Sequence, residues 1–381
     1  MFFPGVRRRV FHLPHALVPF SLAVLAICLT VAGWATFAPS RVGDSTTAPG
    51  IDVQSIKSIA FTVPGTGFDD LVVLPAAPGM APQVIASFPN DPLTRSHARG
   101  AASPQGDRIA VIWLPALATA AEARLSFVDV ATRRRTDIEG AFDYFTAMSW
   151  SSDGSKVALV NSKDMDGLRT VTVYEVDVAS QAKSPVAAFE NVFEAVPVGY
   201  SFDGSRLFSV VIDQRGSNLY TVRAGRIELV GELSPGRTGY WALSPDGARL
   251  AFVDILGSGS RRYVGRTMTI ATGAISTLPA EKNHFGATWM PGSPLPSFGG
   301  PGGAWQLTDP GAQNGYIVPD AWSPDGELLV ATVYSQADDP AGRPLTAIEI
   351  ITPTTTTSPS SRYRVSDASG ASFLGWVKNL N

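Results

Sequence analysis

A four-residue turn that occurs five times limits what this chain can fold into more than any other feature. Each copy opens on Ser and closes on Gly, and four of the five carry Asp at the third position. Pro presets the backbone at the second position, Asp suits the third, and Gly accepts the left-handed conformation that closes a hairpin. The residues predicted to form these turns are Ser103, Gly106, Asp153, Gly154, Asp203, Gly204, Pro245, Asp246, Gly247, Pro324, Asp325 and Gly326.

An apolar run follows every copy of the turn, as in "ARLAFVD" (248–254) and "ELLVATV" (327–333). Continuous apolar runs of this length are typical of strands that are covered on both faces. Further strand-like segments lie between the copies, so each unit contains four strands. No segment after residue 38 shows a convincing helical period. The sequence therefore predicts an all-β fold.

The spacing of the turns identifies the kind of all-β fold. The first residues of successive turns are 48, 50, 43 and 79 residues apart. A β-propeller repeats one four-stranded blade every 40–50 residues or so, and the last interval is close to two such repeats. A degenerate copy at 287–298, with Trp289 ahead of Pro291 and Gly292, fills that interval. We therefore predict a β-propeller over residues 53–381.

Each end of the predicted propeller holds an incomplete unit. Residues 371–379 look like a strand whose turn and continuation are missing, and residues 56–88 look like three strands without a partner. Pairing the C-terminal strand with the N-terminal three would close the ring and cover its edges. This arrangement favours seven blades. Six blades is the alternative if residues 287–320, which include the Gly/Pro-rich segment 291–305, contribute no full blade.

The repeat resembles that of a known family. The Ser-Pro-Asp-Gly turn, followed by a basic residue and an apolar strand, is similar to the TolB-like, WD40-like repeat of bacterial β-propellers. The polar hairpins in 161–178 and 211–223 are similar to that family as well. The resemblance covers roughly residues 98–335. It implies the fold and, by analogy with TolB-like proteins, a place in an envelope complex, but no particular activity.

The N-terminal region predicts a membrane anchor. Residues 16–38 contain no charged residue, and a helix of this length spans the apolar core of a bilayer. Arg7, Arg8 and Arg9 precede the run, which places residues 1–15 in the cytoplasm by the positive-inside rule. We expect a signal anchor over 16–38, a linker over 39–52, and a propeller outside the bacterial cytoplasmic membrane.

Two alternatives to the uncleaved anchor remain open. A signal peptide cleaved near "GWA" (33–35) would release a secreted propeller. Processing near "LAIC" (25–28) would instead produce a lipoprotein, although Ile27 stands where a small residue is expected.

Charge and residue content argue against several kinds of site. After residue 38 the chain carries 27 basic and 33 acidic residues, which is no electrostatic footprint for nucleic acid. The single cysteine, Cys28, excludes an intramolecular disulfide and a Cys-based zinc site. His97 and His284 are isolated and are expected in loops. We find no phosphate loop, dinucleotide fingerprint or G-x-S-x-G motif, and predict no cofactor, no metal and no catalytic residues.

The predicted binding residues lie on the face opposite the turns. If each turn joins the first two strands of a blade, the next hairpin must project from the other face of the disk. Binding residues tend to lie on varied loops over a rigid scaffold. The charged residues of these hairpins are the candidates, namely Asp164, Asp166, Arg169, Asp213, Arg215, Arg261, Arg262, Asp338, Asp339 and Arg343.

These patterns predict a non-enzymatic module that binds another envelope protein or complex. The four repeated Asp residues are expected to form turns, because they recur once per unit around a ring. The alternative is a propeller-type hydrolase or lyase, such as a lactonase or a glycan-cleaving enzyme, with its site in the central channel. That alternative requires several acidic or histidine residues to converge in the channel.

Overall fold

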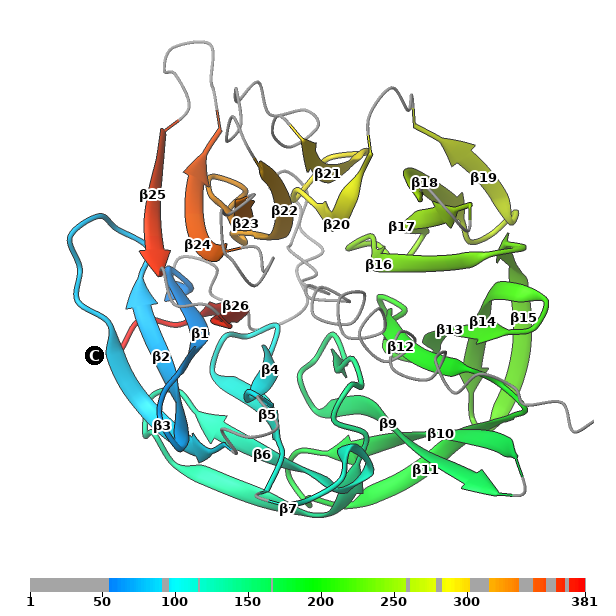
Figure 1. The fold of residues 1–381 in the computed structure, drawn as a ribbon, viewed down its shortest axis with the longest axis horizontal. Coiled ribbons are helices and arrows are strands. Elements are labelled where there is room, and N and C mark those ends of the chain that lie inside the picture. Colours follow the sequence, from blue (N-terminus) through cyan, green and yellow to red (C-terminus); the bar gives the residue numbers. More distant parts are fainter. Residues whose placement is uncertain are drawn as a thin grey trace, which may run out of the picture.

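The chain forms a ring of antiparallel sheets (Figure 1). The computed structural model describes residues 55–90, 96–115, 117–165, 167–257, 261–278, 283–301, 315–335, 345–353, 361–366 and 370–380. The predicted tail, anchor and linker over 1–52 lie outside these residues. No helix within the described ranges is long and apolar enough to cross a membrane.

Three four-stranded sheets are formed by the strands between residues 58 and 190 together with the C-terminal strand. Blade 1 contains β26 (Ser372–Val377), β1 (Ser58–Pro64), β2 (Phe68–Pro75) and β3 (Gln83–Pro89). Blade 2 contains β4 (Arg99–Ala102), β5 (Arg108–Trp113), β6 (Ala123–Asp129) and β7 (Arg135–Phe142), with the short 3-10 helix η2 (Ala120–Glu122) between β5 and β6. Blade 3 contains β8 (Ser149–Trp150), β9 (Lys156–Met165), β10 (Leu168–Asp177) and β11 (Lys183–Glu190).

Three further sheets complete the ring. Blade 4 contains β12 (Glu194–Tyr200), β13 (Leu207–Asp213), β14 (Gly216–Arg223) and β15 (Arg226–Ser234). Blade 5 contains β16 (Arg237–Leu243), β17 (Arg249–Leu256), β18 (Arg262–Thr269) and β19 (Ala274–Thr277). Blade 6 has six strands, β20 (Phe285–Trp289), β21 (Pro296–Pro301), β22 (Gly315–Trp322), β23 (Leu329–Ser335), β24 (Leu345–Thr352) and β25 (Ser361–Ser366).

The expectation of seven blades is wrong, because the described strands form six sheets. Among the residues that the structure describes, the degenerate unit supplies the hairpin β20–β21, and β21 pairs through Gly300 and Pro301 with β22 of the next unit. Glycine makes this junction possible, since a β-carbon on Gly299 would collide with the carbonyl oxygen of Ile317. The hairpin therefore extends blade 6 and does not form a separate sheet.

Blade 1 joins the two ends of the chain. Strand β26 pairs antiparallel with β1, from Ser58 opposite Val377 to Thr62 opposite Ser372. Phe373, Leu374, Trp376 and Val377 of β26 are almost completely buried. These side chains pack on both sides, against the first strands of the chain and against the neighbouring sheets.

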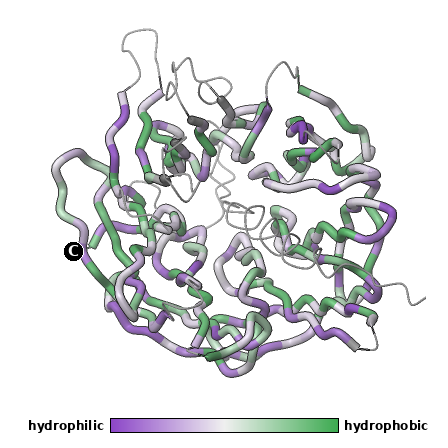
Figure 2. Tube along the Cα trace, viewed as in Figure 1, coloured by the Kyte–Doolittle hydropathy of each residue, from purple (hydrophilic) through white to green (hydrophobic). Residues whose placement is uncertain are grey.

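The core lies between neighbouring sheets. One cluster, for example, combines Ile112 and Phe127 of blade 2 with Trp150 and Leu159 of blade 3. The outermost strands are exposed, as in all four residues of β19, and Figure 2 shows β25 at the rim largely in the hydrophilic colour. Burial therefore selects apolar residues in the inner strands and polar residues at the rim.

Tryptophans that directly precede the turn position also tie neighbouring units together. Trp150 Nε1 donates to the carbonyl oxygen of Ala101 at 2.9 Å, and Trp289 Nε1 donates to that of Ala242 at 2.9 Å. Trp376 Nε1 approaches the carbonyl oxygen of Ala321 at 3.4 Å in the same way. The tether thus recurs in the degenerate unit and in the C-terminal strand, which places β20 and β26 in the ring as innermost strands.

Candidate protein-binding face

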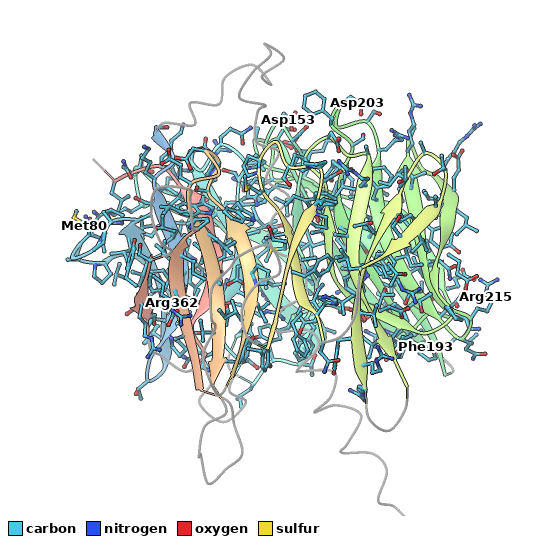
Figure 3. All side chains as sticks on the ribbon, turned by 90° about the horizontal axis from the view of Figure 1, so that it is seen from above. Met80, Asp153, Phe193, Asp203, Arg215 and Arg362 are labelled. Carbon is cyan, nitrogen blue, oxygen red and sulfur yellow. The ribbon has the colours of Figure 1, made fainter. Side chains whose placement is uncertain are left out.

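The first four Ser-Gly turns join the first two strands in the chain order of blades 2 to 5, and the fifth joins β22 and β23 of blade 6. All of them lie on one side of the disk, which we call the turn face. In the third copy, Ser201 Oγ donates to Asp203 Oδ1 at 2.6 Å and accepts from the backbone N–H of Arg206 at 3.0 Å. Gly204 closes the turn with φ of 67°. Figure 3 shows Asp153 and Asp203 together on this side.

The turn carboxylates are held by their own turns. The hydrogen bond from Ser201, with further bonds from Ser205, lowers the pKa of Asp203 to about 2. For Asp153 and Asp246, partial burial works in the opposite direction, but the hydrogen bonds within the turn outweigh it and the pKa of each is lowered. An acid with a lowered pKa and occupied lone pairs is a poor proton donor.

In the first copy of the turn, Gln105 stands in place of Asp, and the turn serine donates to a different carboxylate. Ser103 Oγ donates to Asp107 Oδ1 at 2.7 Å, so the carboxylate comes from the residue after Gly106. Gln105 Nε2 instead reaches the carbonyl oxygen of Ser152 in the next turn, at 3.4 Å.

The opposite side, which we call the loop face, holds the predicted binding residues that the structure describes. Asp164 and Arg169 face each other across the β9–β10 hairpin. Asp213 and Arg215 form an ion pair of 2.9 Å within the β13–β14 hairpin. Arg261 and Arg262 are exposed at the start of β18 in blade 5, whereas the other two hairpins belong to blades 3 and 4. Asp166, Asp338, Asp339 and Arg343 lie outside the described residues.

Connections between blades bring residues to the loop face that the hairpin argument missed. The backbone N–H of Val192 donates to the carbonyl oxygen of Arg169 at 3.3 Å, and that of Phe193 donates to Ile212 at 2.8 Å. The Arg237 guanidinium lies 5.9 Å from the centre of the Phe193 ring. We call the resulting group the blade 3–4 patch, which consists of Leu168, Arg169, Phe193, Glu194, Arg215 and Arg237.

The blade 3–4 patch combines exposed apolar surface with positive charge. Phe193 is 50% exposed and Leu168 is 56% exposed. Burial raises the pKa of Glu194, and the nearby Arg237 and Arg169 only partly oppose it. Phe193 and Arg215 lie on the same side of the disk in Figure 3, away from Asp153 and Asp203. Apolar anchors flanked by arginine are typical of protein interfaces.

Exposed apolar side chains occur on both faces of the disk. Among the described residues, the turn face exposes Phe202, Met290 and Leu295, and Met80 is exposed in the connection from β2 to β3, which returns on the same side. The loop face exposes Phe68, Leu117, Phe145, Leu168, Phe193 and Leu256. The outermost strands β3, β15 and β19 expose Val84, Ile227, Leu229 and Ile275. The blade 3–4 patch therefore stands out by its combination of apolar and basic side chains, and not by the number of exposed apolar residues on its face.

Histidines and acidic residues give no metal centre among the described residues, where no group of three or more potential ligands converges. His97 Nδ1 lies 3.1 Å from Oδ1 of the buried Asp69, which also binds Asn90 Nδ2 and the backbone N–H of Ala98. His284 is buried against Phe298, and burial lowers its pKa. Both histidines therefore help to hold the connections between blades.

Solved structures with the same fold include TolB and two kinds of enzyme, a peptidase and a lyase. TolB from Acinetobacter baumannii superposes with a TM-score of 0.51 at 16% identity, over 83% of this chain and 65% of that one. The acylaminoacyl peptidase of Pyrococcus horikoshii gives 0.54 at 11% identity, over 82% and 51%. An oligogalacturonate lyase in complex with manganese gives 0.53 at 11% identity, over 86% and 91%.

Sequence comparison adds nothing to these likenesses, since no family model and no curated protein matches the chain. The chain spans 65% of the TolB structure, 51% of the peptidase and 91% of the lyase. At these identities the likeness concerns the fold. The chain has the fold of the TolB-like bacterial β-propellers.

Proposed function

We propose that this chain is a membrane-anchored, extracytoplasmic propeller that binds another envelope protein through its loop face. The observation that carries the proposal is the blade 3–4 patch, in which half-exposed Phe193 and Leu168 lie among Arg169, Arg215 and Arg237. Exposing a phenylalanine of this kind to water is costly unless a partner covers it. Arg215 and Arg169 are paired with Asp213 and Asp143, so Arg237 is the arginine that would steer an acidic partner toward the patch.

The enzyme alternative rests on the fold, which the peptidase and the lyase share, and propellers host many unrelated activities. We favour binding because the turn carboxylates are committed to local hydrogen bonds, while the loop face offers apolar and basic side chains without a converging acid–base set in its described part.

A matched pair of variants tests the binding proposal. Phe193 on the loop face and Phe202 on the turn face are 50% and 51% exposed, so truncation to alanine removes a similar apolar area from each. The full-length protein would be crosslinked in cells and extracted in mild detergent, and its partners quantified by mass spectrometry. We expect Phe193→Ala, alone or with Arg237→Ala, to lose a partner that Phe202→Ala retains. Equal partner recovery from both variants would contradict the use of this face.

The anchor is tested separately. We propose that residues 16–38 are retained and hold the protein in the membrane, because the run is long enough to span it. The intact mass of the purified protein would show whether the N-terminus is present, and resistance to carbonate extraction would show integration. A mass that matches a chain starting near residue 36 would instead establish the secreted form.

A further inference from the structure

A second group of side chains on the loop face is chemically unlike the blade 3–4 patch. Five aromatic residues of blades 5 and 6, which we call the aromatic cluster, contact one another in sequence. They are Tyr240 of β16, Tyr263 of β18, Phe285 of β20, Tyr316 of β22 and Tyr334 of β23. Figure 1 shows β16, β20, β22 and β23 following one another around the ring.

Three of the rings lie close together with nearly parallel or tilted planes, and a further ring meets them edge-on. Tyr316 and Tyr334 are stacked, with centroids 4.7 Å apart and planes at 8°, and Phe285 lies 4.7 Å from Tyr316. Tyr240 meets Phe285 edge-on, with centroids 6.4 Å apart and planes at 77°. All five rings are half-buried, so each keeps part of its surface accessible.

A buried carboxyl group belongs to the same neighbourhood. Asp320 lies four residues after Tyr316 on β22, is 6% exposed, and accepts a hydrogen bond of 2.7 Å from Thr332 Oγ1. Burial raises the pKa of Asp320 to about 7. Thr332, which donates to Asp320, and Tyr334 are two residues apart on β23, so their side chains share one face of the sheet. Burial raises the pKa of Tyr334, and Tyr240, Asp320 and Tyr316 each add to that shift.

Comparison with the other innermost strands shows that Asp320 is out of place as a core residue. It stands three residues before the turn position, at a β-bulge that recurs in these strands. The residues at the equivalent position of the described innermost strands are Gly100, Met148, Val198, Trp241, Ala287 and Leu374. None of these has a charge, and burying a carboxyl where the fold elsewhere accepts apolar groups costs stability.

Tyr240, one ring of the aromatic cluster, lies at a strained position of the backbone. Tyr240 is a non-glycine residue with φ of 55°, at the bulge of β16, and bulges redirect side chains. Strained backbone of this kind is a common property of ligand sites. Within the described residues Asp320 has no cationic partner, and the hydroxyls of Tyr263, Tyr316 and Tyr334 make no hydrogen bond.

We propose that the aromatic cluster and Asp320 bind an alkylammonium group. Aromatic faces attract an organic cation through the ring quadrupole, and a carboxylate in a desolvated place supplies the opposite charge. The cation would complete the pairing that a buried carboxylate requires. When Asp320 is protonated, binding releases its proton to the buffer and leaves an ion pair between the carboxylate and the ammonium group.

The test uses the full chain and two probes of the same shape. Choline carries a quaternary ammonium group, and 3,3-dimethylbutan-1-ol is its uncharged isostere. Titration calorimetry at pH 8 should show choline binding at least ten times more tightly than the alcohol. Asp320→Asn, which keeps the size of the side chain, should abolish that preference, whereas Phe202→Ala on the turn face should leave it unchanged. n-Butylammonium distinguishes a primary amine, such as a lysine side chain, from a quaternary ligand.

The unmodified protein provides a readout that does not depend on the folding of a variant. Choline affinity should fall about tenfold between pH 8 and pH 6 as Asp320 becomes protonated, and at pH 6 the heat of binding should vary with the ionisation enthalpy of the buffer because a proton is released. Equal affinities for choline and the alcohol, absence of choline binding, or binding without proton release at pH 6 would overturn the proposal.

Discussion

The carboxyl groups of the turns and of the inner strand β22 differ more than their residue type suggests. On the turn face, Asp203 accepts hydrogen bonds from Ser201 and Ser205, and its pKa falls to about 2. Inside the ring, on β22, burial raises the pKa of Asp320 to about 7. An aspartate that recurs in four of the five turns is therefore part of the scaffold, while a single carboxyl at an apolar position is a candidate for function.

The loops of the two faces also differ in how their polar groups are used. On the turn face, each Ser and Asp bonds within its own turn. On the loop face, the half-exposed Phe193 and Leu168 lie at the ends of connections between strands and blades, next to Arg237 and Arg169. A propeller can therefore keep one side for closing its hairpins and use the other for contacts.

Opening the ring should abolish the difference between the faces altogether. Deletion of residues 370–381 removes β26 and with it the buried Phe373, Leu374, Trp376 and Val377. Each buried apolar side chain is worth about 2 kcal/mol or more, so their sum is comparable to the whole stability of a domain. We expect loss of cooperative thermal unfolding by circular dichroism. A truncated protein with an unchanged melting temperature would show that β26 does not close the ring.

Replacing Asp320 should change how stability depends on pH. Its folded-state pKa is raised from 3.8 to about 7, so the native state holds the proton more tightly than the unfolded chain does. The favourable contribution is complete below the unfolded pKa and is lost as the pH rises from about 4 to about 7, by at most about 4 kcal/mol. Urea denaturation between pH 4 and pH 8 should show this fall in the natural protein and a flatter profile in Asp320→Asn.

Thr332→Val is the companion variant, because it removes the hydroxyl that donates to Asp320 and keeps the carboxyl. It should preserve the decline of stability with rising pH and make it larger, since the ionised form loses a hydrogen bond. Profiles of equal slope for the natural protein and Asp320→Asn would assign the decline to other groups.

The repeat made the architecture predictable, and a glycine pair made the blade count unpredictable. The turn and strand pattern gives the all-β propeller, and residues 371–379 and 56–88 contain β26 and β1–β3, which share a sheet. Trp289 and its turn give no sign that β21 would join β22. That outcome depends on the close approach of two backbones at Gly299 and Gly300, which is a tertiary contact.

The candidate site was predictable only in part, for a geometric reason. Reasoning from hairpins reaches Arg169, Asp213 and Arg215, because each lies in or beside a local turn. Phe193 and Arg237 come from connections between blades, which return to the same face only because every blade has an even number of strands. Asp320 could have been found in the sequence by aligning the residues three places before each turn, where it is the charged exception.

A smaller effect is expected for the carboxylates that close the turns. Asp203→Asn and Asp107→Asn each weaken the bond from the turn serine, in a regular copy and in the copy that has Gln105. We expect each to lose about 1 kcal/mol at pH 7. For Asp203 the contribution is present above the unfolded pKa of 3.8 and is lost as the pH falls through about 2. Denaturation of both variants at pH 7 checks whether Asp107 replaces the missing turn Asp.

The smallest effect on stability should come from the two exposed phenylalanines, and it makes the comparison of faces interpretable. Phe193→Ala and Phe202→Ala remove side chains that are already half in water, so each should change the free energy of unfolding by about 0.5 kcal/mol or less. Phe193→Ala also removes the contact with Arg237, which is worth a similar amount at an exposed site. Matched denaturation curves of the two variants would show that any loss of a partner by Phe193→Ala reflects the surface itself. A loss of several kcal/mol would instead make Phe193 part of the scaffold that holds blades 3 and 4 together.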